Sequence, residues 1–241
     1  MPHAVVLLTD FGTRDPYVAS MKGVIASRCD AAIHDLTHEI APQDVFEAAW
    51  FLRAAEKWWD AGTIFVCVVD PGVGTPRRIL VAESGGRVFL APDNGLLTFV
   101  DLQTIVSVEN EAFFLPGGST TFHGRDRFAP VAAAIANGIL ISKLGPSVDD
   151  IVRLDHESGS IVAIDRFGNA ITDISRAQIP FEPFAVRVGE TVVRRVSATY
   201  EGDGPFVIVG STGAIEISMA GASAADVLHL RRGDRVEIIR S

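Results

Sequence analysis

Residues 64–69 form an apolar run that ends directly on a charged side chain, Asp70. A Pro-Gly-x-Gly turn follows, and Arg77 comes shortly after it. A short apolar run closed by a turn predicts a buried strand, and open α/β sheets bind ligands at the carboxyl ends of such strands. Gly72 and Gly74 are predicted to allow positive φ and a close approach to a ligand. Taken alone, the pattern is better explained by a strand-terminating turn with a solvated carboxylate, and the functional interpretation gains support only from the further polar loops described below.

The first half of the chain alternates strand and helix patterns. Strands are predicted at residues 4–9, 32–36, 64–69, 79–82 and 88–90, and helices from Asp15 or Pro16 to about Ser27, after a cap at Asp44, and over 128–138. Alternation of this kind predicts an α/β domain whose largely parallel sheet is covered on both faces.

The second half has a different sequence pattern. From about residue 158, short β-rich runs are separated by Gly, Pro and Asp turns, and only residues 225–230 suggest a helix. This pattern predicts a smaller antiparallel, β-barrel-like C-terminal domain. The predicted organisation is therefore an α/β N-terminal domain over 1–147, a linker over 148–157 and a β domain over 158–241.

Charge and cysteine content narrow the functional classes. The chain of 241 residues has 21 Lys and Arg against 30 Asp and Glu, a net charge of −9, and no basic run. Such a chain is a poor binder of nucleic acid. Cys29 and Cys67 are far apart, which does not suggest a disulfide framework. With no signal-peptide pattern and no apolar segment long enough to span a bilayer, we expect a cytoplasmic protein without membrane contact.

Two further loops in the first half carry polar residues and are candidate sites. Asp10 follows the first predicted strand, where a carboxylate can accept hydrogen bonds from both hydroxyls of a ribose, although a helix-capping role fits the spacing equally well. His123 precedes the alanine-rich helix, and the adjacent Gly124 would let a ligand approach its ring. A lone histidine is more often structural. Asp126 is predicted to cap that helix and to pair with Arg125.

The second half contributes two more loops. Residues 165–169 read Asp-Arg-Phe-Gly-Asn, which suits a turn with Gly or Asn at positive φ. The same residues combine an aromatic face with an amide, as a site needs to stack a base and bond its edge. Residues 210–213 form a small-residue loop that an ordinary β-turn would explain.

Several familiar motifs are absent from the sequence. There is no Gly-Lys-Ser/Thr of a P-loop and no Gly-x-Ser-x-Gly elbow. His34 and His38 are four residues apart, but the segment reads as strand and turn, on which such side chains do not converge. We therefore predict no metal site.

Taken together, eight segments resemble one family in order and spacing: LLTDFG, PYVASMKGVI, DLTHEIAPQD, VVDPGVGTPRR, APDNGLL, TFHGRDRFAP, IDRFGN and GSTGAIEIS. It is the S-adenosylmethionine hydrolase (hydroxide adenosyltransferase) family, related to the fluorinase and chlorinase enzymes. The resemblance implies a homotrimer that binds S-adenosylmethionine between the N-terminal domain of one subunit and the C-terminal domain of its neighbour. It also implies hydrolysis to adenosine and L-methionine, with no metal or redox cofactor.

The resemblance assigns roles to individual residues. Asp10 matches the family's ribose-binding carboxylate, and Asp70, Arg77 and His123 match its set at the hydrolytic water. Asp165, Phe167 and Asn169 match positions around the methionine tail and the adenine. Ser211, Glu216 and Met219 fall in the C-terminal loop and strand that close around the ligand in the family, and Tyr200 resembles the aromatic that stacks on adenine.

One difference within this family bears on the chemistry. Halide-using members carry Tyr where this chain has Asp70, and a hydroxyl residue near Val73, and the fluorinase has Ser at the position of Gly124. An anionic Asp70 would repel a halide in a site of low dielectric constant, so the sequence predicts hydrolysis. The alternatives are a halide transferase and a non-catalytic protein that binds adenosine or S-adenosylmethionine.

Overall fold

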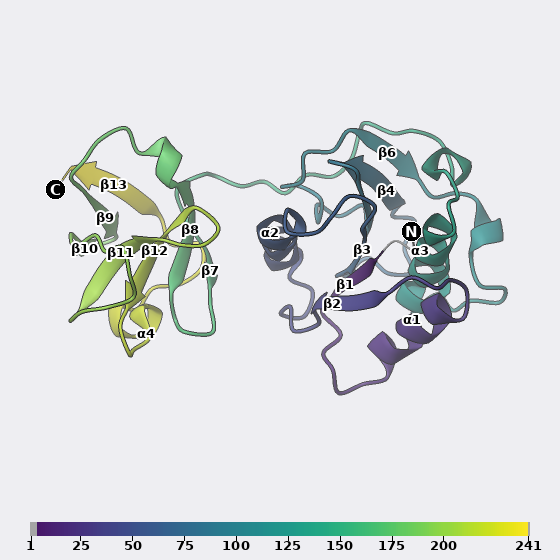
Figure 1. The fold of residues 1–241 in the computed structure, drawn as a ribbon, viewed down its shortest axis with the longest axis horizontal. Helices are drawn as coiled ribbons and strands as arrows, with labels where there is room; N and C mark the ends of the chain where they lie inside the picture. The colour runs from purple at the N-terminus through teal and green to yellow at the C-terminus, as the bar shows by residue number, and fades with distance from the viewer. Residues whose placement is uncertain (1–3, 241) are drawn as a thin grey trace. The chain divides into compact units, whose positions relative to one another are not determined.

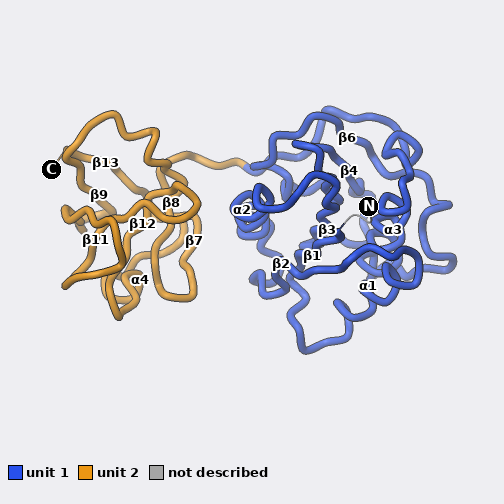
Figure 2. Tube along the Cα trace, viewed as in Figure 1, with its two compact units in different colours: residues 1–154 blue, residues 155–241 orange. Residues whose placement is uncertain are grey.

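The computed structural model describes residues 4–240. The chain divides into two compact units, Met1–Leu154 and Asp155–Ser241, shown in blue and orange in Figure 2. The division falls inside the segment 148–157 that the sequence predicts as a linker. None of the helices in the described part of the chain is long and apolar enough to cross a membrane.

The first unit contains one mixed sheet with helices on both faces (Figure 1). Its strand order is β2-β1-β3-β5-β4-β6; β2, β1, β3 and β5 are parallel neighbours, and β4 runs antiparallel to both of its neighbours. The prediction of a mostly parallel α/β domain is confirmed. The elements are β1 (Val5–Thr9), α1 (Tyr17–Ala26), β2 (Ile33–Thr37), α2 (Val45–Glu56), β3 (Ile64–Val68), β4 (Ile79–Ser84), β5 (Arg87–Pro92), β6 (Thr104–Ser107) and α3 (Ala129–Ala136).

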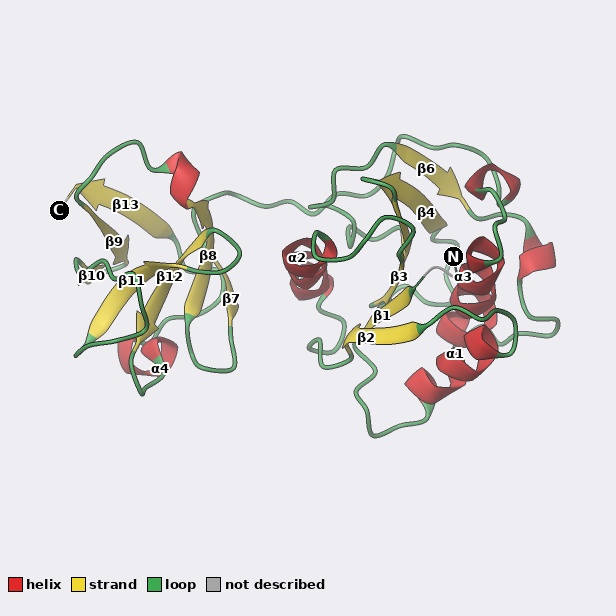
Figure 3. Cartoon of the chain, viewed as in Figure 1, coloured by secondary structure: helices red, strands yellow, loops and turns green. Residues whose placement is uncertain are grey.

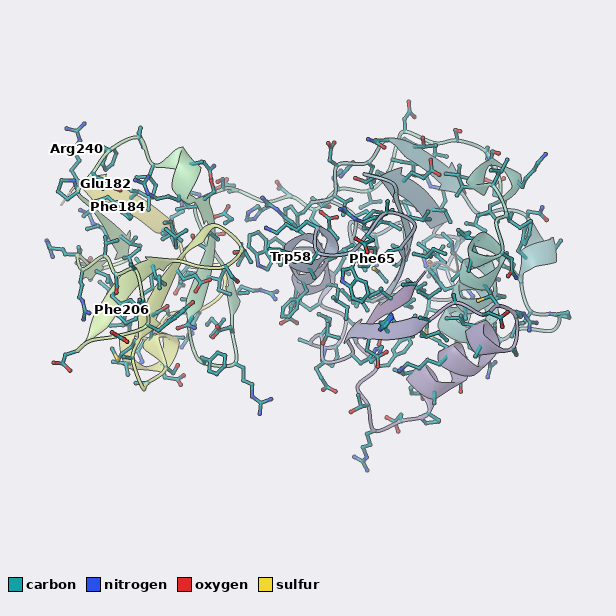
Figure 4. The ribbon with its side chains drawn as sticks, in the orientation of Figure 1. Trp58, Phe65, Glu182, Phe184, Phe206 and Arg240 are labelled. Atoms are coloured by element: carbon teal, nitrogen blue, oxygen red, sulfur yellow. The ribbon has the colours of Figure 1, made fainter. Side chains whose placement is uncertain are left out.

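Alternation along the buried strands divides the apolar side chains between two cores. In β3, Val66 faces the core that α1 and α3 cover, whereas Phe65 faces the core under α2. Phe65, labelled in Figure 4, stacks on Phe89 with ring centroids 5.1 Å apart. As predicted, Asp44 caps α2, because its side chain accepts the Glu47 N–H over 2.9 Å.

The strand order sets the position of the candidate site. From β1 the chain continues to β2 on one side, and then returns to β3 on the other. The carboxyl ends of β1 and β3 therefore lie at the point where the strand order reverses, which is where open α/β sheets form a crevice. Thr9 is paired with Val68 at these ends, so Asp10 and Asp70 follow two neighbouring strands.

The second unit is built from two antiparallel sheets, a short α-helix and a 3₁₀ turn at Arg176–Gln178 (Figure 3). The strand orders are β10-β9-β13 and β11-β12-β8-β7, and the antiparallel prediction is confirmed. This unit also contains two isolated bridges, Ser160–Arg235 and Val196–Val207. The elements are β7 (Ile161–Ile164), β8 (Ala170–Ser175), β9 (Phe184–Val188), β10 (Thr191–Val193), β11 (Pro205–Val209), β12 (Ala214–Met219), α4 (Ala224–Leu228) and β13 (Val236–Arg240).

Candidate active site

A cavity of about 690 Å³ opens at the carboxyl ends of β1 and β3. Its walls come from the corners after these strands, the loop before α3 and the start of α1. This is the crevice that the strand order predicts. The residues lining it are Asp10, Phe11, Tyr17, Gln43, Val68, Asp70, Pro71, Val73, Ser119, Thr121, Phe122, His123, Gly124 and Arg125.

Asp70 is held by Arg77 through both carboxylate oxygens. Arg77 Nε donates to Oδ1 over 2.8 Å, and Nη2 donates to Oδ2. The pair is largely removed from solvent, with 4% of the Asp70 side chain and 9% of the Arg77 side chain exposed. A two-pronged contact of this kind fixes the carboxylate plane more firmly than a single donor could.

The turn after Asp70 depends on one glycine. Gly74 has φ of +81°, and a Cβ at this position would lie 2.8 Å from the Thr120 carbonyl oxygen. Gly74 therefore lets the turn pack against the loop that leads to His123. The prediction of positive φ is wrong for Gly72, which lies outside that region; a Cβ there would make an ordinary contact with Arg77.

His123 completes a cluster with Asp70 and Arg77. Its Nδ1 lies 2.9 Å from Arg77 Nη2. Because a guanidinium only donates, Nδ1 must accept, and the neutral ring then carries its proton on Nε2. Burial lowers the pKa of His123 below its ordinary value, and the nearby cations Arg127 and Arg77 lower it further, which favours that neutral form.

Two donors of this cluster are left without partners. His123 Nε2 and Arg77 Nη1 are both buried, and neither has a hydrogen-bond partner within the described chain. An unpaired buried donor is costly, and in a native protein it calls for an explanation. Two unpaired donors in a cluster that lines a cavity indicate a place for an oxygen-bearing ligand.

The segment before α3 positions His123. Residues Gly124–Phe128 form a π-helical turn that leads into α3. Asp126 pairs with Arg125, from Nε to Oδ1 over 2.6 Å, and accepts the Ser119 N–H over 2.7 Å. The pairing is confirmed, but the prediction that Asp126 caps the helix is wrong, because α3 begins after Phe128 with no side-chain cap. The carboxylate instead ties the loop around Ser119 to the turn.

Asp10 lies at the cavity wall next to a constrained segment. Its Oδ2 accepts the Gln43 N–H over 2.8 Å, and Gln43 has φ of +66°, which is uncommon outside glycine. The alternative that Asp10 caps a helix is not supported, because α1 begins after Pro16 without a side-chain cap. Within residues 4–240, no hydrogen bond engages Oδ1 of Asp10, which leaves this oxygen for a ligand.

Sequence reasoning missed a group of three aromatic residues in this cavity. Phe11, Tyr17 and Phe122 meet edge to face, with ring centroids 5.2 to 6.0 Å apart. A Cβ on Gly124 would lie 3.3 Å from both phenylalanine rings. Phe11 and Phe122 directly follow or precede predicted site residues in the sequence, and this adjacency was the available signal. The group supplies an apolar part of the cavity wall.

The second unit has its own cavity, of about 620 Å³. Asp165 organises one side, because Oδ1 accepts the Phe167 and Asn169 N–H groups over 2.9 Å and Oδ2 accepts Asn169 Nδ2 over 2.8 Å. Gly168 has φ of +81°, as predicted for this turn. The lining residues are Asp165, Phe167, Asn169, Tyr200, Met219, Ala220, Gly221, Ala222 and Ser223.

Two exposed aromatic rings line this second cavity. Phe167 is 76% exposed and Tyr200 is 52% exposed, and both line the same cavity. The Tyr200 hydroxyl donates to the buried Glu216 over 2.9 Å. Burial, with this hydrogen bond, raises the pKa of Tyr200 to about 12. Burial also raises the pKa of Glu216, and the Asp165 charge adds to the shift, although the Tyr200 hydrogen bond opposes it.

The structure therefore brings most of the predicted residues together in two groups. Asp10, Asp70 and His123 line the first cavity with Arg77 directly behind, and Asp165, Phe167, Asn169, Tyr200 and Met219 line the second with Glu216 beneath Tyr200. Ser211 is exposed and lies outside the lining of either cavity. Within residues 4–240, no three His, Cys, Asp or Glu side chains are grouped so that they could hold a metal ion.

Comparison with family models matches both units. Residues 5–145 match the N-terminal domain of the SAM (S-adenosylmethionine) hydroxide adenosyltransferases, and residues 159–237 match their C-terminal domain. The chain belongs to this family. The SAM hydroxide adenosyltransferase resemblance that the sequence motifs indicate is thus confirmed.

Relatives with assigned names agree with this membership. An (R)-S-adenosyl-L-methionine hydrolase of Thermus thermophilus is 39% identical over 98% of this chain and 99% of that protein. One of Methanocaldococcus jannaschii is 33% identical over 98% and 95%. A fluorinase of Actinopolyspora mzabensis is 27% identical over 98% and 97%.

Solved structures show the same fold. A conserved protein of Thermotoga maritima superposes with a TM-score of 0.92 at 33% identity, over 98% of this chain and 100% of that one. A conserved protein of Thermus thermophilus superposes with a TM-score of 0.83 at 35% identity, again over 98% and 100%.

Proposed function

We propose that this chain hydrolyses S-adenosyl-L-methionine to adenosine and L-methionine, with water displacing the sulfonium at C5′ of the ribose. The hydrolase relatives cover nearly the whole chain. The observation that carries the proposal is the cluster of Asp70, Arg77 and His123, a buried carboxylate beside two buried donors that lack partners. A water molecule that accepts from His123 Nε2–H and donates to Asp70 would keep one lone pair free.

In the proposed mechanism, the water accepts a hydrogen bond from His123 Nε2–H and donates one to Asp70. Its free lone pair attacks C5′ as the C5′–S bond breaks, and the bonding electrons leave on the methionine sulfur. The water proton passes to Asp70 and then to solvent. Arg77 fixes the plane of the Asp70 carboxylate through two N–H groups.

The leaving group explains why we propose no metal or redox cofactor. A sulfonium carries a positive charge and departs as a neutral thioether, so neither an acid nor a Lewis acid is needed to stabilise it. The protein must place the nucleophile and exclude competing water. Dialysis against a chelator is expected to leave the rate unchanged; a loss that Mg²⁺ or Zn²⁺ restores would overturn this part.

Substrate binding is proposed to use both cavities. Asp10 accepts the ribose hydroxyls in the first. In the second, Phe167 and Tyr200 stack on adenine and Asn169 bonds its edge. We assign the surroundings of the methionine tail and the closure over the ligand to Asp165, Ser211, Glu216 and Met219.

We propose a homotrimer in which the first cavity of one subunit and the second cavity of its neighbour enclose one substrate. Support comes from the distribution of groups, because the water-directing residues and the exposed aromatic rings belong to different units.

For the second unit we propose a barrel-like closure, since the bridges Ser160–Arg235 and Val196–Val207 join residues in or next to the edge strands of its two sheets. Two free cysteines, Cys29 and Cys67, favour a reducing cytoplasm.

Complementation tests the shared site. Asp70→Asn damages the first cavity and Asn169→Ala the second, so each variant alone should be nearly inactive. Co-expressed subunits would form some sites from one intact cavity of each kind, and activity should return. No recovery in a mixed trimer would place the whole site within one chain.

The function is tested by incubating the pure protein with the separate sulfonium epimers. The relatives' names specify the (R) form, and inversion at sulfur exchanges the methyl group and the methionine chain around the bond to C5′. We expect adenosine and methionine from the (R) epimer at a higher rate than from the (S) epimer. Release of neither product overturns the proposal, and a 5′-halogenated product in added chloride or fluoride would favour a halide transferase.

A further inference from the structure

We propose that Thr9 and His38 are positioning residues that hold Asp10 and Phe11 at the wall of the first cavity. This inference rests on the ribose-binding role proposed for Asp10. It concerns a series of polar contacts that lies behind the cavity and outside the Asp70 cluster, running from Thr9 at the end of β1 to Lys22 in α1.

The Thr9 end of this series of polar contacts is buried. Thr9 Oγ1 lies 2.8 Å from His38 Nδ1, and it accepts the Phe11 N–H over 3.2 Å. Thr9 is fully buried and His38 is 4% exposed. A Thr hydroxyl beside a His ring resembles an activated nucleophile, but no substrate can reach a hydroxyl without accessible surface. Its contacts instead fix the backbone of Phe11, directly after Asp10.

The backbone of residues 38–43 holds the turn that contains Asp10 from the other side. The His38 carbonyl accepts the Gly12 N–H over 2.7 Å, and the Gln43 N–H donates to Asp10 Oδ2 over 2.8 Å. Residues 38–43 thus contact the corner at Thr9, Asp10 and Gly12. Displacement of His38 would therefore move Asp10, whose carboxylate we propose as the acceptor of the ribose hydroxyls.

The other end of this series of polar contacts anchors His38 to β2 and α1. His38 Nε2 lies 2.9 Å from Asp35 Oδ1, although not in a regular hydrogen-bond geometry. Lys22 Nζ donates to Asp35 Oδ2 over 2.6 Å. Burial opposes ionisation of Asp35, but the contacts with Lys22 and His38 outweigh it and lower the pKa of that carboxyl. The charged Asp35 holds the outer edge of the ring between β2 and α1.

The first test compares the binding of adenosine and 2′,3′-dideoxyadenosine by calorimetry, because only adenosine offers the ribose hydroxyls to Asp10. Thr9→Val removes the hydroxyl but keeps shape and branching, and Thr9→Ser is the matched control that keeps the hydroxyl. We expect Thr9→Val to reduce the preference for adenosine roughly three- to tenfold, as one lost hydrogen bond would. Thr9→Ser should keep the wild-type preference.

A second pair of variants separates the two sides of the ring. The amide of His38→Asn reaches about as far as Nδ1 and can still meet Thr9, whereas that of His38→Gln reaches about as far as Nε2 and meets Asp35. We expect His38→Asn to keep the preference for adenosine and His38→Gln to lose it. This pair also decides the question if Thr9→Val does not fold.

The possible outcomes are distinct. If Thr9→Val weakens the binding of adenosine and of 2′,3′-dideoxyadenosine by the same factor, or weakens neither, the contacts around Asp10 have only a structural role. The inference is then overturned. Retained preference in His38→Gln with loss in His38→Asn also overturns it. If the wild-type protein itself does not distinguish the two nucleosides, the ribose role proposed for Asp10 fails instead.

Discussion

Arg77 donates two hydrogen bonds to Asp70, from Nε to Oδ1 over 2.8 Å and from Nη2 to Oδ2. The same Nη2 group lies 2.9 Å from His123 Nδ1. One guanidinium therefore orients the carboxylate and favours the imidazole tautomer that carries its proton on Nε2. A water-directing site requires both.

Replacement of Asp70 by Asn tests the carboxylate itself. Asn is isosteric but cannot take a proton from water, so we expect kcat to fall by about 10²- to 10⁴-fold, with little change in the Kd for adenosine. Arg77→Lys is a useful companion, because it keeps the charge but cannot contact both oxygens, and its loss should be smaller. Unchanged kcat in Asp70→Asn would remove this residue from the mechanism.

The pH dependence of activity follows from His123. Burial and neighbouring cations lower the pKa of this ring below 6.5, so it stays neutral through the neutral range. We expect kcat/KM to be flat there and to decline only as the pH falls through the lowered pKa. A decline that begins well above pH 6.5 would contradict the assignment.

The same shift has a consequence for stability. As the pH falls below the ordinary histidine pKa, the unfolded chain takes up a proton at His123 before the folded protein does. The free energy of unfolding should therefore decrease with falling pH in the window between the lowered pKa and about 6.5. Chemical denaturation of the wild type and of His123→Gln at several pH values measures this, and the contribution should be missing in the variant.

The turn after Asp70 offers a matched pair of glycine variants. Gly74→Ala forces an L side chain into positive φ and brings its Cβ to 2.8 Å from the Thr120 carbonyl oxygen. We expect it to lower the free energy of unfolding by about 1–3 kcal/mol and to reduce activity. Gly72→Ala meets only ordinary contacts and should change stability by less than about 1 kcal/mol. Equal effects of the two variants would show that the turn tolerates rearrangement.

Tyr200 and Glu216 in the second unit are coupled. Tyr200→Phe keeps the stacking ring but leaves Glu216 buried without its 2.9 Å donor, so we expect a loss of about 1–3 kcal/mol in stability and little change in adenosine affinity. Weak adenosine binding in this variant would show that the hydroxyl, rather than the ring, contacts the ligand.

Glu216→Gln should have the opposite effect at neutral pH. The pKa of Glu216 is raised by burial and by Asp165, so wild-type stability falls as the pH rises from the ordinary glutamate pKa through the raised one. The amide keeps an acceptor for Tyr200 without the charge. We expect a higher Tm at pH 7 and no such pH dependence; a lower Tm would mean that the charge itself is stabilising.

Local rules predicted the elements that position the site. Asp44 and the apolar run before Asp70 carry their own cap and strand signals, and both elements are present. Asp10 and Asp70 come together because parallel strands end at the same edge of a sheet. The strand order, with β3 returning beside β1, decides that they are neighbours.

The remaining features depend on tertiary contacts that no local pattern encodes. The hydrogen bond from Arg77 to His123 joins residues 46 positions apart. Asp126 stands where a cap is expected, yet its carboxylate accepts the Ser119 N–H and pairs with Arg125. The φ values of Gly72 and Gly74 differ although both belong to one turn, since only Gly74 packs against Thr120.

The most direct test of the central claim is a single turnover of S-adenosylmethionine in ¹⁸O-labelled water, followed by mass spectrometry of the adenosine. Direct attack by the water held at Asp70 predicts one labelled oxygen, located in the 5′-hydroxyl. Unlabelled adenosine would contradict the account, because the oxygen would then have come from a group other than that water.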